Sequence, residues 1–137
     1  MKTKIAALCV LLVAFGITTA AVLQAAEHTK DSLKTVKERL KQKQAVLIDV
    51  RELREWTEGH LRDARLVPLS ELRNSEKLKA AVKKLPKDKI IYCHCRSGGR
   101  VLIAAPILKK AGFDIRPLKH GFVDLLKAGF PMATKKK

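Results

Sequence analysis

One short segment of the sequence, residues 95–100 (CRSGGR), combines a nucleophile with groups that bind anions. Two adjacent glycines permit backbone conformations that point successive N–H groups inward and so form an anion-binding nest. Two arginines add fixed positive charge, and a helix that follows the segment directs its positive end to the same place. These surroundings favour the thiolate, the nucleophilic form of a cysteine. We expect Cys95 to be the nucleophile in a substrate-binding loop made by Arg96, Ser97, Gly98, Gly99 and Arg100.

The elements that must position this loop follow from the hydrophobic pattern. We expect strands over residues 45–50, 66–67, 89–93 and 115–118, and helices over residues 31–42, 52–58, 76–85, 101–110 and 122–128. Ser75 is the predicted cap of the third helix, and Gly59 and Gly112 are predicted to end the second and fourth. Alternating strands and helices indicate a small three-layer α/β fold, with a mostly parallel central sheet and helices on both faces. Cys95 would then stand at the carboxyl edge of the sheet, where open α/β folds bind ligands.

Several segments of this chain resemble the rhodanese family. Residues 48–51 (IDVR), followed by Trp56 and the pair Gly59-His60, look like that family's first signature, and residues 95–100 look like its active-site loop. Residues 108–113 and 128–131 resemble its later landmarks. The resemblance runs in the family's order over about residues 45–132 and implies a rhodanese-like fold. Together with an export signal, it makes the chain most similar to small periplasmic single-domain rhodaneses of the phage-shock-protein E type.

The resemblance implies a thiosulfate sulfurtransferase. The cysteine would take a sulfane sulfur from thiosulfate or a similar donor and pass it to a thiophilic acceptor, cyanide or a thiol. Cys95 would be the nucleophile and persulfide carrier. Asp49 and Arg51 would be supporting residues, hydrogen-bonded or ion-paired near the loop. His60, after a glycine turn, is interpreted as a structural hydrogen-bond partner rather than a proton carrier.

The same residues also suggest other chemistries. Phosphatase loops place five residues between cysteine and arginine, whereas four separate Cys95 from Arg100, a spacing that fits a smaller sulfur-centred group. Cys93 lies two residues before Cys95, so both side chains face the same way on a strand. Cys93 is interpreted as a core residue, with a resolving thiol or a disulfide partner of Cys95 as the alternative. An extracytoplasmic thiol–disulfide redox protein and a non-catalytic anion-binding rhodanese module are the alternative functions.

The amino-terminal residues have the layout of a targeting segment. Residues 1–4 are basic, residues 5–17 are apolar, and residues 18–26 are rich in small side chains, as in a secretory signal. The longer apolar stretch over residues 5–26 is also nearly long enough to span a bilayer, which takes ~20 residues, so an uncleaved membrane anchor is the alternative. Either interpretation places a single domain, residues 27–137 with its core at 45–132, outside the cytosol. In a Gram-negative cell that compartment is the periplasm.

Composition limits the partners. The formal net charge is +16, from 29 basic and 13 acidic side chains, but only 4% of residues are aromatic. The lysines are spread along the chain and no aromatic platform for bases is available, so no nucleic-acid partner is expected. A basic surface instead suits a small anionic sulfur donor. No cofactor is expected, and no metal either, since a second cysteine pair is absent from the sequence. A membrane contact is expected only through an uncleaved leader, and oligomeric state is left open.

Overall fold

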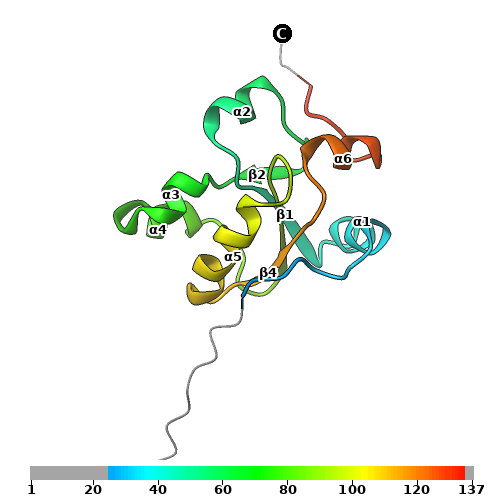
Figure 1. Ribbon diagram of the computed structural model, residues 1–137. Helices are drawn as coiled ribbons and strands as arrows, with labels where there is room; N and C mark the ends of the chain where they lie inside the picture. Colours follow the sequence, from blue (N-terminus) through cyan, green and yellow to red (C-terminus); the bar gives the residue numbers. More distant parts are fainter. Residues whose placement is uncertain (1–24, 135–137) are drawn as a thin grey trace, which may run out of the picture.

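Figure 1 shows the computed structural model, which describes residues 25–134 of the 137-residue chain. The predicted leader, residues 1–26, lies outside this range except for its last two residues. The elements run in the order α1 (Leu33–Lys41), β1 (Ala45–Asp49), α2 (Leu53–Glu58), β2 (Ala64–Leu66), α3 (Leu69–Arg73), α4 (Ser75–Val82), β3 (Ile90–His94), α5 (Arg100–Lys110), β4 (Asp114–Pro117) and α6 (Phe122–Lys127). Within residues 25–134, no helix is long and apolar enough to cross a membrane.

A parallel sheet forms the centre of the fold. Its strands stand in the order β2-β1-β3-β4, and every neighbouring pair is parallel. The two central strands are short apolar runs whose side chains are almost all buried, because a parallel sheet has its two faces covered by helices. Ile48 is paired with Cys93 and Asp49 with His94, so the polar ends of β1 and β3 meet at one edge.

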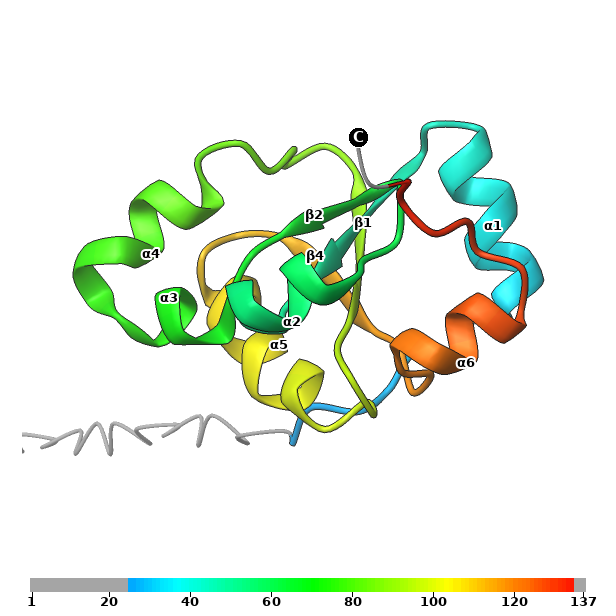
Figure 2. The ribbon, with the colours of Figure 1, turned by 90° about the horizontal axis from the view of Figure 1, so that it is seen from above.

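Helices cover the two faces of the sheet, which confirms the predicted α/β fold (Figure 2). On one face, α3, α4 and α5 lie over the larger core, which contains Ile48, Val50, Ile91, Cys93, Cys95, Val101, Ala104 and Leu108 among others. On the other face, α1 and α6 lie over the smaller core, which contains Val36, Leu47, Leu61, Tyr92, Leu118, Leu125 and Phe130. The short helix α2 has no buried residue and lies apart from both layers (Figure 1).

The prediction of the segment between β2 and β3 was partly wrong. Asn74, not Ser75, caps α4, because its Oδ1 accepts hydrogen bonds from the backbone N–H groups of Glu76 and Lys77 at 3.0 and 3.1 Å. Ser75 is instead the first residue of that helix. The helix ends at Val82, three residues before its predicted end. The sequence analysis also missed α3, a five-residue helix that begins after Pro68, since one turn is too short to show a helical period.

Candidate active site

Cys95 directly follows the last residue of β3, at the carboxyl edge of the sheet. Its Sγ accepts a hydrogen bond from the backbone N–H of Gly98 at 3.2 Å. Its carbonyl oxygen accepts another from the N–H of Phe122, the first residue of α6, at 2.9 Å. Only 1% of the residue is exposed, so the loop folds back over the thiol. The sulfur therefore lies beside one backbone donor, the Gly98 N–H, at the edge of the sheet where a site was predicted.

Two glycines allow the loop to pack closely against the segment before α6. Gly98 has φ +86°, in the left-handed region, and a Cβ there would lie 2.4 Å from the carbonyl oxygen of Lys119. At Gly121, a Cβ would lie 1.9 Å from the carbonyl oxygen of Arg96. Gly99 differs, since a Cβ there would meet nothing within 4 Å. The close approach thus requires glycine at 98 and 121, whereas position 99 has room for a side chain.

The two loop arginines have different surroundings. Arg100, at the start of α5, donates hydrogen bonds to both carboxylate oxygens of Glu55 in α2, at 2.6 and 2.8 Å. These bonds from Arg100 lower the pKa of Glu55 to about 2. Arg96 is exposed and makes no ion pair within residues 25–134. Of the two fixed charges expected beside the thiol, one is neutralised by a carboxylate and one is available to an anion.

Asp49 and Arg51 form a buried ion pair beneath this edge. Arg51 donates to both carboxylate oxygens of Asp49, with the closest contact 2.7 Å from Nη2 to Oδ2. The same Nη2 donates to the carbonyl oxygen of Gly59 at 2.8 Å, at the end of α2. The guanidinium also lies over the ring of Phe122, 4.2 Å from its centroid. Arg51 therefore connects the end of β1 to both α2 and α6, the elements that flank the loop.

The predicted supporting residue His60 lies two residues beyond the end of α2. His60 donates a hydrogen bond from Nδ1 to the carbonyl oxygen of Trp56, 3.0 Å away, and its ring stacks on the indole of Trp56. This contact is structural and lies at the end of α2. Trp56 itself is half-buried.

Cys93 and His94 precede the nucleophile and are both fully buried. Cys93 packs in the same core cluster as Cys95, and both thiols are free. Burial raises the pKa of Cys93, so its thiol stays protonated. Burial lowers the pKa of His94, whose Nε2 stands 3.7 Å from Asp49 Oδ2 without a hydrogen-bond partner. Neither residue is exposed to solvent.

A cavity of about 230 Å³ opens beside the loop. Arg96 contributes the loop's part of its wall, and the other lining residues are Arg51, Glu55, Glu58, Gly59, Phe122, Val123 and Met132. Within residues 25–134, no three His, Cys, Asp or Glu side chains gather in a way that could hold a metal ion. The cavity is a small recess next to a shielded thiol, and its charged lining residues are two arginines, Arg51 and Arg96, and two glutamates, Glu55 and Glu58.

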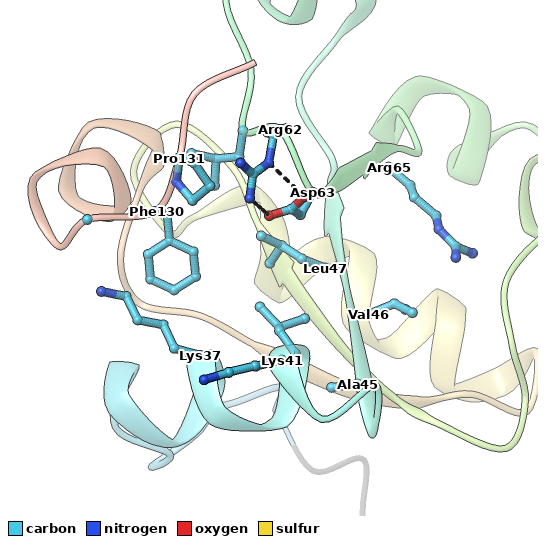
Figure 3. Close-up of a pocket in the computed structure, with 13 residues that line it drawn as sticks. Lys37, Lys41, Ala45, Val46, Leu47, Arg62, Asp63, Arg65, Phe130 and Pro131 are labelled. Atoms are coloured by element: carbon cyan, nitrogen blue, oxygen red, sulfur yellow. Dashed lines mark hydrogen bonds and ion pairs between the residues drawn. The ribbon is translucent and has the colours of Figure 1, made fainter. Parts of the chain in front are cut away.

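A second cavity, of about 420 Å³, lies at the opposite end of β1 (Figure 3). It is bounded by α1, the first residues of β1 and the chain after α6, and it contains none of the predicted site residues. Arg62 and Asp63 at its rim pair with each other, as the dashed lines show. Volume alone therefore does not identify the reactive site in this fold.

Two residues at the active site were missed by the sequence analysis. Glu55, the partner of Arg100, is one of several charged residues in a short exposed helix. His28 contacts Gly98 from a position 70 residues away. Neither carries a local sequence signal, because each is brought to the loop only by the tertiary fold.

An α/β domain with a cysteine-bearing anion loop at the carboxyl edge of a parallel sheet is the class of protein that this fold and site define. Residues 32–128 match the Rhodanese-like domain family, and the chain belongs to that family.

Its relatives include proteins of different size. The "Probable adenylyltransferase/sulfurtransferase MoeZ" of Mycobacterium tuberculosis is 40% identical over 78 residues, which are 56% of this chain and 19% of that protein. The "Uncharacterized protein YqhL" of Bacillus subtilis is 38% identical over 81 residues, 58% of this chain and 60% of that protein. This chain therefore matches less than two thirds of the length of either relative.

Solved structures include similar single domains. The human single-domain sulfurtransferase TSTD1 superposes with a TM-score of 0.59 at 25% identity, covering 71% of this chain and 94% of that one. The protein hp1203 of Helicobacter pylori superposes with a TM-score of 0.56 at 34% identity, covering 69% of this chain and 87% of that one.

Proposed function

We propose that this protein is a sulfurtransferase that carries sulfur as a persulfide on Cys95, with thiosulfate or a similar anion as donor. The Cys95 thiolate attacks the sulfane sulfur of thiosulfate, the S–S bond of the donor breaks, and sulfite leaves with the bonding electron pair. A Cys95 persulfide remains on the protein. Cyanide or a thiolate acceptor then attacks the outer sulfur, so that thiocyanate or an acceptor persulfide leaves and the Cys95 thiolate is regenerated.

The contact between the Gly98 N–H and Cys95 Sγ carries this proposal. A backbone donor aimed at the sulfur stabilises negative charge there, both on the attacking thiolate and on the persulfide. Arg96 lies exposed on the wall of the neighbouring recess, where it would attract a dianionic donor. Membership of the rhodanese-like family supports sulfur transfer as the general class of activity.

The environment of Cys93 disfavours the redox alternative. A disulfide exchange protein needs a second thiol that reaches the thiolate form and meets its substrate. Cys93 is fully buried in β3, and its raised pKa keeps it protonated. A module that only binds anions does not need a thiol, so this alternative does not account for the hydrogen bond from the Gly98 N–H to Cys95 Sγ.

We also propose that the domain works outside the cytosol, as a small exported rhodanese of the phage-shock-protein E type. The support is the layout of residues 1–26 in the sequence, with a basic start, an apolar centre and small residues at the end. A membrane-anchored form with the domain on the same side is the alternative. Labelling of intact cells with a membrane-impermeant reagent separates a cytosolic form from an exported one. The size of the mature chain then separates a released form, which has lost its leader, from an anchored one, which keeps it.

Mass spectrometry tests the proposed chemistry. The purified protein is treated with thiosulfate, and the peptide that contains Cys95 is analysed for wild type and for Cys95→Ala. We expect a gain of one sulfur atom on wild type alone, reversed by cyanide with release of thiocyanate. A fully reduced wild-type protein that gains no sulfur from thiosulfate or another sulfane donor would contradict the proposal. A native mass lower by two hydrogens would favour the Cys93–Cys95 disulfide instead.

A further inference from the structure

His28 contacts the Cys95 loop from the segment that precedes α1. Its Nε2 lies 2.8 Å from the carbonyl oxygen of Gly98. A carbonyl oxygen can only accept, so His28 must be the donor, with its proton on Nε2. The N–H of the same Gly98 donates to Cys95 Sγ at 3.2 Å. One glycine thus connects the histidine on one side with the nucleophilic sulfur on the other.

The segment that carries His28 is fixed to the fold at two further points. The N–H of Thr29 donates to the carbonyl oxygen of Pro117 at 2.7 Å, which attaches the segment to the end of β4. The Asp31 carboxylate then accepts hydrogen bonds from Tyr92, Arg39 and Arg116, at 2.7, 2.7 and 3.0 Å. These bonds, that from Tyr92 foremost, lower the pKa of Asp31. His28 is therefore placed by contacts with three other elements, β3, α1 and β4.

Gly98 needs such an external restraint. It has φ +86° and no side chain, so the loop has a wide choice of conformations at this residue. On one side, its Cα packs against the carbonyl of Lys119, which any Cβ would meet at 2.4 Å. That contact excludes larger residues but provides no donor to hold the peptide in one orientation. The hydrogen bond from His28 supplies a donor to the Gly98 carbonyl, and so fixes the peptide group that follows Gly98 and limits the ψ angle of this residue.

We propose that His28 is a positioning residue for the sulfur-binding loop. By donating to the Gly98 carbonyl, it holds the Gly98 N–H on the Cys95 sulfur, and thereby favours the thiolate before attack and the persulfide after it. The inference rests on the proposed sulfurtransferase function, but its geometric part concerns only the Cys95 thiolate. It also makes the stretch directly after the predicted leader, residues 27–31, a functional part of the domain.

Four full-length proteins test this role: wild type, His28→Ala, His28→Gln and His28→Phe. The amide nitrogen of glutamine is a donor placed much as Nε2 is, whereas phenylalanine fills the space without a donor. Lys30→Ala, at an exposed position in the same segment, is the matched control. The readouts are the pH profile of Cys95 alkylation, followed on its own peptide, the kcat and KM for thiosulfate, and the urea midpoint.

We expect His28→Phe and His28→Ala to shift the alkylation profile to higher pH and to lower kcat/KM about fivefold, the effect of losing one hydrogen bond. His28→Gln should restore most of both, and Lys30→Ala should match wild type. If His28→Ala does not fold, the Gln and Phe pair decides. Wild-type profiles in His28→Phe, or equal losses in His28→Gln and His28→Phe, would overturn the positioning role. If wild type forms no persulfide while the alkylation profiles still separate Gln from Phe, the positioning role stands and the proposed function fails.

Discussion

Arg100 donates two hydrogen bonds to the Glu55 carboxylate, and so joins the first turn of α5 to α2. The pair is only partly exposed, with 28% of the arginine side chain and 22% of the glutamate side chain accessible. It fixes the end of the Cys95 loop against the helix that borders the neighbouring recess. The arginine left to attract a substrate is then Arg96, which is exposed on the wall of that recess.

Replacement of Glu55 by glutamine should destabilise the protein in a pH-dependent way. The pKa of Glu55 is about 2 in the folded state and about 4.3 in an unfolded chain, so the pair stabilises the fold above about pH 5. That contribution is lost as the pH falls towards 2. At pH 7 we expect a loss of about 1 kcal/mol for a partly exposed, bidentate pair.

Urea unfolding of Glu55→Gln and wild type at pH 7, 5 and 3 measures this effect. The difference in free energy of unfolding should shrink steadily with decreasing pH. Glu58→Gln is the control, because its 3.5 Å pair with Arg54 is exposed on the same helix and should contribute less than about 0.5 kcal/mol. A constant difference across the three pH values would contradict the assignment to the Glu55 carboxylate.

Removal of Arg51 alone should lower the free energy of unfolding more than removal of both Arg51 and Asp49. In Arg51→Met the Asp49 carboxylate, fully buried, is left without its partner, and we expect a loss of about 3–5 kcal/mol. The double variant Asp49→Asn/Arg51→Met removes the stranded charge and should recover part of that loss. Chemical unfolding of the two single variants and the double variant gives the coupling energy. A double variant no more stable than Arg51→Met would show that Arg51 acts mainly through Gly59 and Phe122.

Much of this architecture could be predicted from the sequence, because its signals are local. A few consecutive residues are enough to recognise the apolar runs of β1 and β3 and the loop of residues 95–100. The four strands that the structure describes in residues 25–134, and five of the helices there, were predicted to within a few residues at their ends. The location of Cys95 after a strand followed from the same pattern.

What the sequence did not reveal depends on contacts between distant segments. The sequence predicts that Arg100 offers a positive charge to an anion. In the fold, α2 brings Glu55, which is 45 residues away in the chain, into a hydrogen bond with Arg100. His28 has no pattern around it, and only the bonds of Thr29 and Asp31 bring it to Gly98. The need for glycine at 121 likewise arises from the backbone of Arg96, which local propensity does not include.

Cys93 should be dispensable for sulfur transfer. Its thiol is fully buried and its pKa is raised by burial, so we expect it to act neither as a nucleophile nor as a resolving thiol. Cys93→Ala removes only a small buried group from the core and should lower the free energy of unfolding by about 1–2 kcal/mol. We expect its Cys95 peptide to gain sulfur from thiosulfate as in wild type. If Cys93→Ala stays folded but its Cys95 peptide gains no sulfur, Cys93 has a chemical role.

Alanine at Gly121 and alanine at Gly99 are a matched pair of substitutions. They add the same methyl group, once where the backbone is crowded and once where there is space. A methyl group at Gly121 would lie 1.9 Å from the Arg96 carbonyl oxygen and 2.6 Å from its carbon, both backbone atoms. The loop and the start of α6 must therefore move apart, although φ at Gly121 is −83° and suits any residue. Overpacking of this kind typically destabilises a protein by about 1–3 kcal/mol. Because the Cys95 carbonyl is bonded to Phe122, the movement should also displace the sulfur from its Gly98 donor.

Gly99→Ala makes the same chemical change where the structure has room for it. Its backbone, with φ −80° and ψ −51°, is already helical, and an added methyl meets nothing within 4 Å. Alanine there should be neutral or stabilise the fold by up to about 1 kcal/mol, since it restricts the unfolded chain. We therefore expect Gly121→Ala to lose both stability and sulfur loading on Cys95, and Gly99→Ala to keep its stability. Urea unfolding and the mass of the Cys95 peptide measure both properties on the same samples. Equal behaviour of the two variants would mean that the close approach of Arg96 to Gly121 does not hold the loop in place.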